Sequence, residues 1–528
     1  MTITEWIIFF LLVQVIHFAA TWKLYQKAGR QAWEAAVPFY NAVVLMKIIN
    51  RPVWWVILLF IPIVNLIMFM VVWVETIRSF GRNSRLDTIL VIVTLGFYIF
   101  YVNYVLDVTY IKDRSLKPRS GVGEWVSSIL FAIIAATLVH TYVMRPFTIP
   151  TSSLEKTLLV GDFLFVSKFH YGARLPMTAI AAPMVHDTIP ILKTKSYVKW
   201  PQVPYFRFPG FTDIRQNDIV VFNWPVDTVN RFYGLDDGKY YDKPIDKKSN
   251  YVKRAVGLPG DSLEIIGGKI FINGDSLQLP DRAKPQYSYI VQGKGQGFDL
   301  NDLIQRYTIT DPIMWYNKEQ RQYQFQALSE DIIAKFKYHP NVEWIKRIEA
   351  PKGKRNIGLF PKKGTQKWNL DHYGPIYIPQ KGKTVKIDTS TIPLYAHIIE
   401  YYDGKEMGTP QEITIQGDQV LMNGQPITQY TFKQDYYWMM GDNRHNSADS
   451  REYGYVPYNH VVGKPVFIWM SWDSNASKLV DKIRWERLFT TVSGSGEPVS
   501  YLYYFLIALV IYIGYSSFRK RKKKTAEE

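Results

Sequence analysis

The chain contains 528 residues, which is too long for one average domain, so we expect at least two folding units. Its formal charge of +17 would suit a nucleic-acid-binding protein, but no basic patch interleaved with aromatic residues stands out. We therefore expect no nucleic-acid partner. The sequence contains no cysteine, which excludes disulfides, cysteine nucleophiles and thiolate metal sites. We expect neither a metal nor a cofactor.

Apolar residues gather in unbroken runs, each close to the roughly 17–25 residues that a helix needs to cross a bilayer core. The runs are Ile3–Thr21, Val53–Val74, Thr88–Leu106, Trp125–Val143 and Ser500–Ser516. Most of these runs lack the polar face that a core helix shows, so we predict that each is a membrane span. Pro62 and Asn65 favour a kinked or re-entrant second segment. The first run lacks a preceding basic region and a small-residue cleavage site, so we expect it to remain as an anchor.

Basic residues predict the orientation of these spans through the positive-inside rule. They follow the last run as Arg519–Lys524, and they precede the fourth run as Lys112, Arg114, Lys117 and Arg119. Both groups should lie in the cytoplasm, so the chain between the fourth and fifth runs should lie outside it. The loop that contains Arg78, Arg82 and Arg85 disagrees, since it would face outward.

The region between the fourth and fifth runs has the pattern of a mainly antiparallel β domain. Short β-prone segments separated by turn residues occur at Phe163–Val166, Ile219–Phe222, Lys269–Asn273 and Val420–Asn423. Asn273-Gly274 and Asn423-Gly424 predict tight hairpins, because a type I′ turn needs positive φ at both central residues. The polar stretch within this region carries no recognisable chemical motif and predicts an insertion.

The predicted fold is therefore a multi-pass α-helical membrane region joined to a mainly antiparallel β extracytoplasmic domain with a large insertion. The expected parts are a membrane region with about three spans at 1–110, an anchor span at 125–143, a β-rich core at 145–263 and 415–490, an inserted β-rich subdomain at 264–414, a final span at 500–516 and a basic tail at 517–528.

A hydroxyl cluster, Thr151-Ser152-Ser153, follows a proline a few residues after the fourth run. By itself such a cluster is typical of a solvated turn. A serine attacks an amide only when a base removes its proton, and the segment Asn250–Asp261 offers Lys253 as that base. On a strand, Lys253 would share a face with Tyr251 and Ala255. Burial would lower the pKa of this lysine and let it act as a neutral amine.

A third segment, Met440–Pro457, is dense in polar residues and follows the apolar run Tyr436–Met440. It contains Asp442, Asn443, Arg444, Asp449 and Arg451. By itself it is typical of a solvated loop, but such a cluster can also supply the hydrogen-bonded support of a catalytic lysine.

Together these segments resemble the bacterial type I signal peptidases, which are serine proteases with a Ser/Lys dyad. The three signature boxes occur in the family order as IPTSSLEKTL at 149–158, KRAVGLPGD at 253–261 and GDNRHNSADSR at 441–451. Arg215–Phe222 matches a further β-strand region, so the resemblance covers the core of residues 145–263 and 415–470. It implies a signal-peptidase catalytic domain on the outer face of the cytoplasmic membrane, with a cytoplasmic carboxy-terminal tail.

The resemblance implies that Ser153 is the nucleophile and Lys253 the general base, with Thr151 and the Ser153 N–H forming the oxyanion hole. It also implies that Ser447 hydrogen-bonds Lys253 and that Gly441 leaves room beside the lysine. Asp449 and Arg451 would form a supporting ion pair, and Arg254 would be a structural partner. Apolar pockets for small side chains would be lined by Phe147, Ile149, Pro150, Leu154, Leu158, Tyr251 and Val252.

The implied activity is removal of signal peptides from secreted preproteins by acyl-enzyme hydrolysis after Ala-x-Ala sites. Implied partners are signal-peptide-bearing preproteins, membrane lipid and the secretion translocon. The chain departs from the family pattern at Ser152, which replaces glycine, at Leu154, which replaces methionine, and at Glu155-Lys156, where x-Pro is usual. Ser152 leaves open which hydroxyl attacks, and the missing proline loosens the loop.

Two other interpretations compete with the dyad. A Ser-His-Asp triad would use His445 or His460 with Asp449, since histidine is the commoner base. Alternatively, the chain would be a catalytically inactive paralogue that acts as a membrane scaffold for exported proteins. The joint presence of serine, lysine and supporting loop argues against the inactive paralogue.

The charge pattern generates a test of topology. Protease added to intact spheroplasts should digest the region 146–498, while a tag placed after Glu528 should stay protected. Protection of the 146–498 region would contradict the positive-inside assignment.

Overall fold

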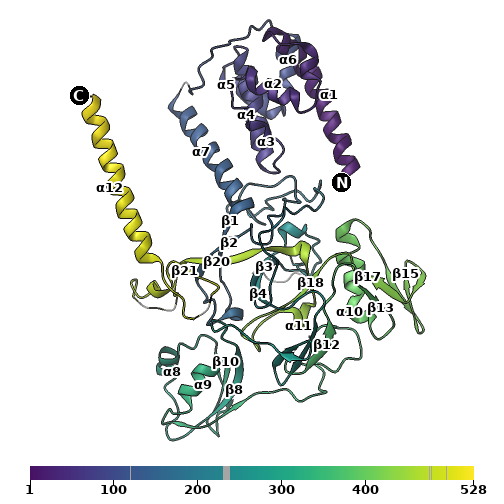
Figure 1. The fold of residues 1–528 in the computed structure, drawn as a ribbon, viewed down its shortest axis with the longest axis vertical. Coiled ribbons are helices and arrows are strands. Elements are labelled where there is room, and N and C mark those ends of the chain that lie inside the picture. The colour runs from purple at the N-terminus through teal and green to yellow at the C-terminus, as the bar shows by residue number, and fades with distance from the viewer. Residues whose placement is uncertain (119, 230–237, 475, 477, 495, 528) are drawn as a thin grey trace. The chain divides into compact units, whose positions relative to one another are not determined.

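The computed structural model describes residues 1–528 except 119, 230–237, 475, 477, 495 and 528 (Figure 1). Arg119 and the side chains of Lys520 and Lys522–Lys524 in the basic tail lie outside the described residues. The chain forms two compact units. The first contains Met1–Val143, Arg174–Phe208 and Tyr240–Lys248, and the second contains Met144–Ala173, Pro209–Lys239 and Ser249–Glu528.

The first unit is mainly helical. Its elements are α1 (Ile3–Lys27), η1 (Ala32–Ala35), α2 (Tyr40–Ile48), α3 (Trp55–Leu58), α4 (Val64–Ser79), α5 (Arg85–Val93), α6 (Tyr98–Tyr104), α7 (Gly121–Leu138) and the π-helical turn η2 (Val139–Val143). Apolar side chains from these helices form one core that includes Leu24, Val44, Met46, Val64 and Ile77. Most residues of α1 and α7 are both apolar and exposed, so these two helices lack a distinct polar face. Exposed apolar side chains of this kind are expected on surfaces that face lipid.

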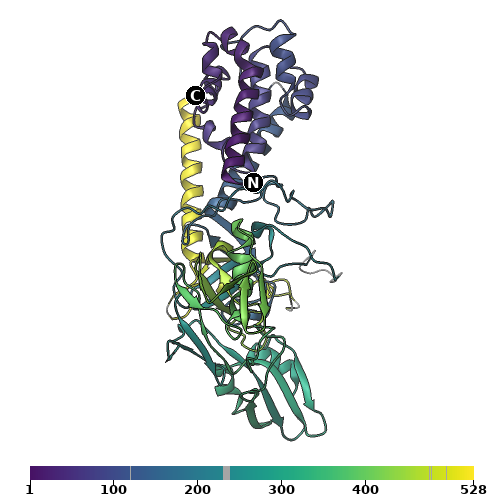
Figure 2. The ribbon, with the colours of Figure 1, turned by 90° about the vertical axis from the view of Figure 1, so that its right-hand side faces the viewer.

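Three helices among the described residues are long and apolar enough to cross a membrane: Ile3–Lys27, Gly121–Val143 and Leu502–Arg519. The last belongs to α12 (Leu502–Glu527), a single long helix of the second unit (Figure 1, Figure 2). Val53–Val74 and Thr88–Leu106 do not form continuous long helices; the break in the first run agrees with the kink that Pro62 and Asn65 favour.

Each of these two runs is divided into a pair of shorter helices by a break in the backbone. The first breaks at Pro62 and at Ile63, which has φ of 72°, and α4 starts only after them. The second breaks at Leu95 and Gly96, with φ of 51° and 87°. Positive φ is incompatible with a right-handed helix, so neither run continues as one unbroken helix.

The second unit is built around an 8-stranded antiparallel sheet with the order β1-β2-β20-β3-β4-β18-β19, in which β21 also pairs with β20. The strands are β1 (Met144–Thr148), β2 (Asp162–Ser167), β3 (Ile219–Asn223), β4 (Asn250–Gly257), β18 (Tyr436–Met440), β19 (Val456–Pro457), β20 (Val461–Ser471) and β21 (Thr490–Thr491). The predicted antiparallel β domain is therefore confirmed. Strand β4 lies between β3 and β18, where backbone bonds on both edges hold it.

Both predicted hairpins are present. Asn273 and Gly274 join β6 (Lys269–Ile272) to β7 (Asp275–Ser276), and Asn423 and Gly424 join β15 (Gln419–Met422) to β16 (Gln425–Ile427). All four turn residues have positive φ, as the type I′ turn requires.

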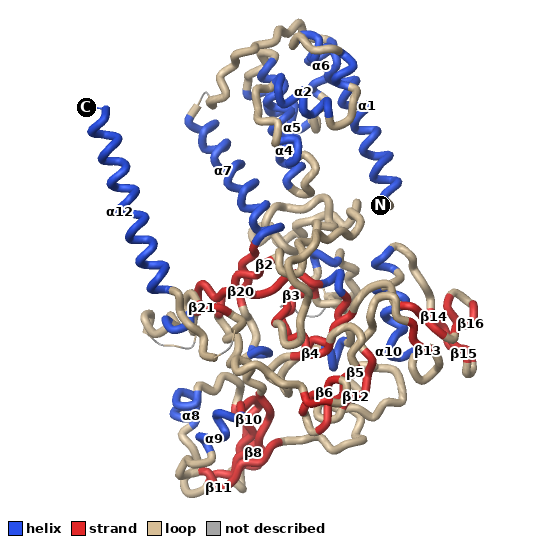
Figure 3. Tube along the Cα trace, viewed as in Figure 1, coloured by secondary structure: helices blue, strands red, loops and turns tan. Residues whose placement is uncertain are grey.

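The chain between β4 and β18 is divided among several smaller structures (Figure 3). Strand β5 (Ser262–Ile266) pairs with β6 and with β12 (Tyr373–Tyr377), and β13 (Thr384–Lys386) pairs with β17 (Gln429–Thr431). Residues 286–347 form what we call the insert lobe. Its elements are β8 (Gln286–Gly293), α8 (Leu300–Tyr307), β9 (Ile313–Asn317), β10 (Gln322–Ser329), α9 (Glu330–Phe336) and β11 (Val342–Arg347).

The remaining elements of this region are short. They are α10 (Ile392–His397), η5 (Ile398–Tyr402), η6 (Lys405–Met407) and β14 (Ile413–Gln416), which pairs with β15. They pack with β5, β6 and β12 on one core that reaches back to Trp438 of β18. The insert lobe has a core of its own, which includes Val291, Phe325 and Phe336.

The core position of Trp438 generates a stability prediction. Its side chain is fully buried and contacts the rings of Tyr373 and Tyr455, at centroid distances of 5.6 and 5.3 Å. Trp438→Ala should lower the free energy of unfolding by about 3–5 kcal/mol because it leaves a cavity. Thermal unfolding of the purified protein measures the change. Trp485→Ala, at a side chain that is 53% exposed, is the matched control and should change the melting temperature little.

Candidate active site

The hydroxyl cluster lies on a turn between β1 and β2, and backbone hydrogen bonds hold both ends of this turn. The Ile149 N–H donates to the Asp162 carbonyl and the Gly161 N–H donates to the Ile149 carbonyl, each at 2.9 Å. Ser152–Leu154 forms a single 3₁₀ turn, η3, and the Leu154 side chain is buried beneath it. The backbone of the turn is thus held by strand contacts and by an apolar anchor.

Lys253 on β4 faces Ser153. Its Nζ lies 2.7 Å from Ser153 Oγ and also donates to the Val252 carbonyl at 3.2 Å. The two side chains are 4% and 7% exposed. Burial lowers the pKa of Lys253 from 10.5 to about 8, although the carboxylates of Asp449, Glu452 and Asp442 oppose this shift. A neutral amine at this distance can accept the proton of the serine hydroxyl.

The neighbouring hydroxyls have different surroundings. Ser152 Oγ donates to Asp311 Oδ1 at 2.8 Å, so Ser153 is the serine of the turn that faces the lysine. Thr151 is exposed and stands at the amino-terminal end of η3. The geometry therefore favours Ser153 over Ser152 as the attacking group and leaves the Thr151 hydroxyl accessible to a ligand.

Two buried ion pairs lie around the lysine. Arg451 donates to both carboxylate oxygens of Asp449, at 2.9 and 2.8 Å, and Asp449 also accepts from the Gly441 N–H at 3.1 Å. Arg254 donates to both oxygens of Asp442, at 2.8 and 2.6 Å. Burial would raise the pKa of each carboxyl, but its arginine partner holds it below the usual range. The structure thus contains the expected Asp449/Arg451 pair and gives Arg254 a partner.

The expected hydrogen bond from Ser447 to Lys253 is not formed. Ser447 Oγ is buried and has no hydrogen-bond partner among the described residues, and the lysine donates to Ser153 and to the Val252 carbonyl. A Cβ atom at Gly441 would lie 2.2 Å from Ser447 Oγ and 2.5 Å from the Ser153 carbonyl oxygen. The absence of a side chain at Gly441 therefore leaves room for Ser447 and for the Ser153 carbonyl.

The residues expected to line the substrate pockets do not all lie at a surface. Phe147 and Val252 are partly buried at the edge of one apolar cluster, while Ile149, Leu154 and Leu158 are buried within it at 4%, 1% and 0% exposure. The last three belong to the core and have almost no exposed surface in this structure. Pro150 is exposed.

Tyr251 differs from the other expected pocket residues because it packs against a second apolar cluster, which contains Ala255. Its ring stacks on Trp224 with centroids 5.1 Å apart, and Lys253 Nζ lies 5.1 Å from its centroid. Lys253 therefore shares the face of Tyr251 and Ala255, as strand alternation predicts.

The histidine triad is not assembled. His445 Nε2 lies 3.0 Å from Asp371, and His460 Nε2 lies 3.0 Å from Glu406. Asp449 is occupied by Arg451. Among the described residues, the side chain that bonds Ser153 Oγ is Lys253 and not a histidine.

Two residues of the insert lobe reach the site and were missed by sequence reasoning. Asp311 accepts the Ser152 hydroxyl, and Gln286 Nε2 donates to the Glu155 carbonyl at 2.7 Å. They belong to no motif, and no spacing signal could have pointed to them.

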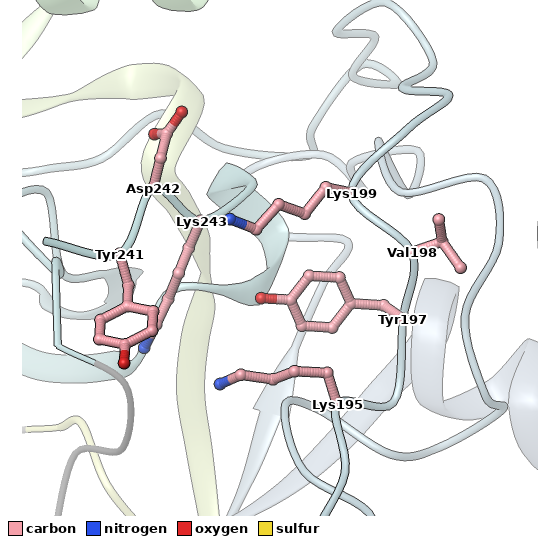
Figure 4. A pocket seen from close by; sticks show the side chains of 7 residues that line it. All are labelled: Lys195, Tyr197, Val198, Lys199, Tyr241, Asp242 and Lys243. Carbon is pink, nitrogen blue, oxygen red and sulfur yellow. The ribbon is translucent and has the colours of Figure 1, made fainter. Parts of the chain in front are cut away.

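A pocket elsewhere contains none of the expected site residues. It encloses about 330 Å³ in the first unit and is lined by Lys195, Tyr197, Val198, Lys199, Tyr241, Asp242 and Lys243 (Figure 4). The dyad belongs to the second unit, with Ser153 on the η3 turn and Lys253 on β4.

Comparisons with known proteins give two family matches and several related proteins. Residues 33–113 match a family of unknown function (DUF5684). Signal peptidase I of Buchnera aphidicola subsp. Acyrthosiphon pisum is 24% identical over 414 residues, which cover 75% of this chain and 95% of that protein. Signal peptidase I of Helicobacter pylori strain 26695 is 24% identical over 388 residues, covering 72% and 96%, and that of Haemophilus influenzae is 23% identical over 390 residues, covering 72% and 79%.

The model of the family described as signal peptidase, peptidase S26, matches residues 122–311 and 378–472, which is more than half of the chain. These matched segments contain Ser153, Lys253 and the 441–451 loop. The chain belongs to this family, as a member of the bacterial type I signal peptidases.

Proposed function

We propose that this protein removes signal peptides from secreted preproteins at the outer face of the cytoplasmic membrane, cleaving after small residues at Ala-x-Ala sites. The observation that carries the proposal is the 2.7 Å contact between the buried Lys253 amine and the Ser153 hydroxyl. Relatives named signal peptidase I and the apolar helices support the membrane location. Preproteins, membrane lipid and the translocon are the proposed partners.

In the proposed reaction, Lys253 Nζ takes the proton of Ser153 Oγ as that oxygen attacks the scissile carbonyl. The Thr151 hydroxyl and the Ser153 N–H then stabilise the oxyanion. The lysine ammonium returns its proton to the leaving amine, which leaves an acyl-enzyme on Ser153. A water molecule that gives its proton to Lys253 hydrolyses this ester, and the proton finally returns to Ser153.

The proposed preference for small side chains rests on the residues that keep exposed surface near the dyad. Pro150, Phe147, Tyr251 and Val252 are fully or partly exposed, and they are rigid or bulky. Walls made of such groups would favour small side chains at the cleavage site, as the family resemblance implies.

The direct test uses detergent-solubilised protein and a preprotein with an Ala-x-Ala site. Site-specific cleavage is expected from the native chain, and Ser153→Ala should abolish it. Thr151→Val should reduce turnover by about 10²–10³, because one oxyanion donor is lost. Ser152→Ala is the comparison variant; it should still cleave, with a loss far smaller than that of Ser153→Ala, because only Ser153 Oγ contacts Lys253. Comparable losses from Ser152→Ala and Ser153→Ala would contradict the assignment of the nucleophile.

A second test concerns the protonation state of Lys253. Its pKa of about 8 lies below the ordinary 10.5, so the active neutral amine becomes more abundant as pH rises through 8. The kcat/KM value should accordingly rise with pH along a limb near 8 and level off above it. Lys253→Arg should be as inactive as Lys253→Ala, because a guanidinium stays protonated. Near-normal cleavage by Lys253→Arg would show that the lysine is only a structural cation.

A further inference from the structure

Asp311 connects the insert lobe to the nucleophile turn. It lies in the loop between α8 and β9, and it is only 7% exposed. One carboxylate oxygen accepts from Ser152 Oγ at 2.8 Å and from Asn446 Nδ2 at 3.1 Å, and the other accepts from Asn443 Nδ2 at 2.5 Å. A single carboxylate thus gathers three donors from two segments that are far apart in the sequence.

These donors belong to the segments that hold the nucleophile. The Asn443 N–H donates to the Ser153 carbonyl at 3.1 Å, and Asn443 Nδ2 also reaches the Ser152 carbonyl at 3.4 Å. By fixing the Asn443 side chain and the Ser152 hydroxyl together, Asp311 restricts the peptide that carries Ser153. The Ser153 Oγ then keeps its place opposite Lys253 Nζ.

The insert lobe also contacts the turn on the carboxy-terminal side of Ser153. Gln286 Nε2 donates to the Glu155 carbonyl, and Lys156 Nζ donates to the carbonyl and the hydroxyl of Thr308. The turn is therefore held on both sides of the nucleophile by one lobe. Asp311 is the contact that acts nearest the reacting serine.

We propose that Asp311 is a positioning residue for the peptidase reaction, holding the Ser152–Ser153 turn against Lys253 through hydrogen bonds to Ser152, Asn443 and Asn446. The proposal rests on the proposed Ser/Lys dyad function. Serine stands at 152 where the family pattern has glycine, and its hydroxyl is the group through which Asp311 reaches the turn. Asp311 touches no reacting atom, so its effect must pass through the orientation of Ser153.

Cleavage of an Ala-x-Ala preprotein by the full-length protein in detergent tests the proposal, with kcat and KM measured separately. Asp311→Ala should lower kcat by roughly 10- to 100-fold, the effect of a small misplacement of a reacting group, while KM changes little. The pH limb set by Lys253 should stay in place. Asp311→Asn should recover most of the loss, since its amide oxygen still accepts from Ser152 and the unpartnered Asn443 Oδ1 can accept from its NH₂.

Controls separate positioning from folding. Asp302→Ala, at an exposed aspartate of the same lobe that pairs with Arg306, should leave kcat unchanged. If Asp311→Ala does not fold, Ser152→Ala takes its place, and a several-fold fall in its kcat at an unchanged melting temperature is expected. In folded protein, the Ser152→Ala/Asp311→Ala double variant should be no slower than Asp311→Ala, because both changes remove the same contact.

Wild-type kcat in folded Asp311→Ala would overturn the proposal, as would additive losses in the double variant or an unchanged kcat in Ser152→Ala. Ser153→Ala in the same assay distinguishes this failure from failure of the dyad. An inactive Ser153→Ala together with a normal Asp311→Ala refutes positioning only. Residual cleavage by Ser153→Ala refutes the dyad, and with it the role of Asp311.

Discussion

The burial of Lys253 against Ser153 is the constraint on which the rest of the site depends. An ammonium group in an apolar environment is destabilised, and this lowers the pKa of the lysine to about 8. The lowered pKa costs roughly 3–4 kcal/mol at neutral pH, because each unit corresponds to about 1.4 kcal/mol. The surrounding fold has to supply that energy, and the aromatic and aliphatic core under the sheet is its source.

Carboxylates close to the lysine would cancel the effect of burial if their charges were unopposed. Asp449 and Asp442 each pair with a buried arginine through two hydrogen bonds, so each pair presents a much smaller net field than a lone carboxylate. Glu452 has no such arginine pair among the described residues, and its charge also opposes the lowering of the Lys253 pKa. The arginines therefore limit how far Asp449 and Asp442 raise the pKa of Lys253, which is a more specific role than general support of the loop.

Residues that belong to short sequence motifs could be predicted from the sequence, whereas contacts between distant segments could not. Ser153, Lys253 and the Asp449/Arg451 pair stand at fixed positions within short boxes, and the hairpin turns are encoded by adjacent residues. The hydrogen bond between Ser152 and Asp311 joins residues that are 159 positions apart. Asp311 lies in the insert lobe, which carries no recognisable motif. Of the two helix breaks, the one beside Pro62 was signalled by that proline, whereas the break at Leu95 escaped prediction because an apolar side chain does not signal positive φ.

The insert lobe restrains the nucleophile turn at the positions where the sequence departs from the family pattern. A proline after the nucleophile would restrict the loop through its ring, but this chain has Glu155 and Lys156 there. The Glu155 carbonyl accepts from Gln286, and the Lys156 amine donates to Thr308, so hydrogen bonds from the lobe restrict the same residues. The Ser152 hydroxyl adds a third such contact through Asp311. Rigidity that a covalent ring would provide locally is supplied here by tertiary contacts, and the order of the nucleophile turn therefore depends on folding of the insert lobe.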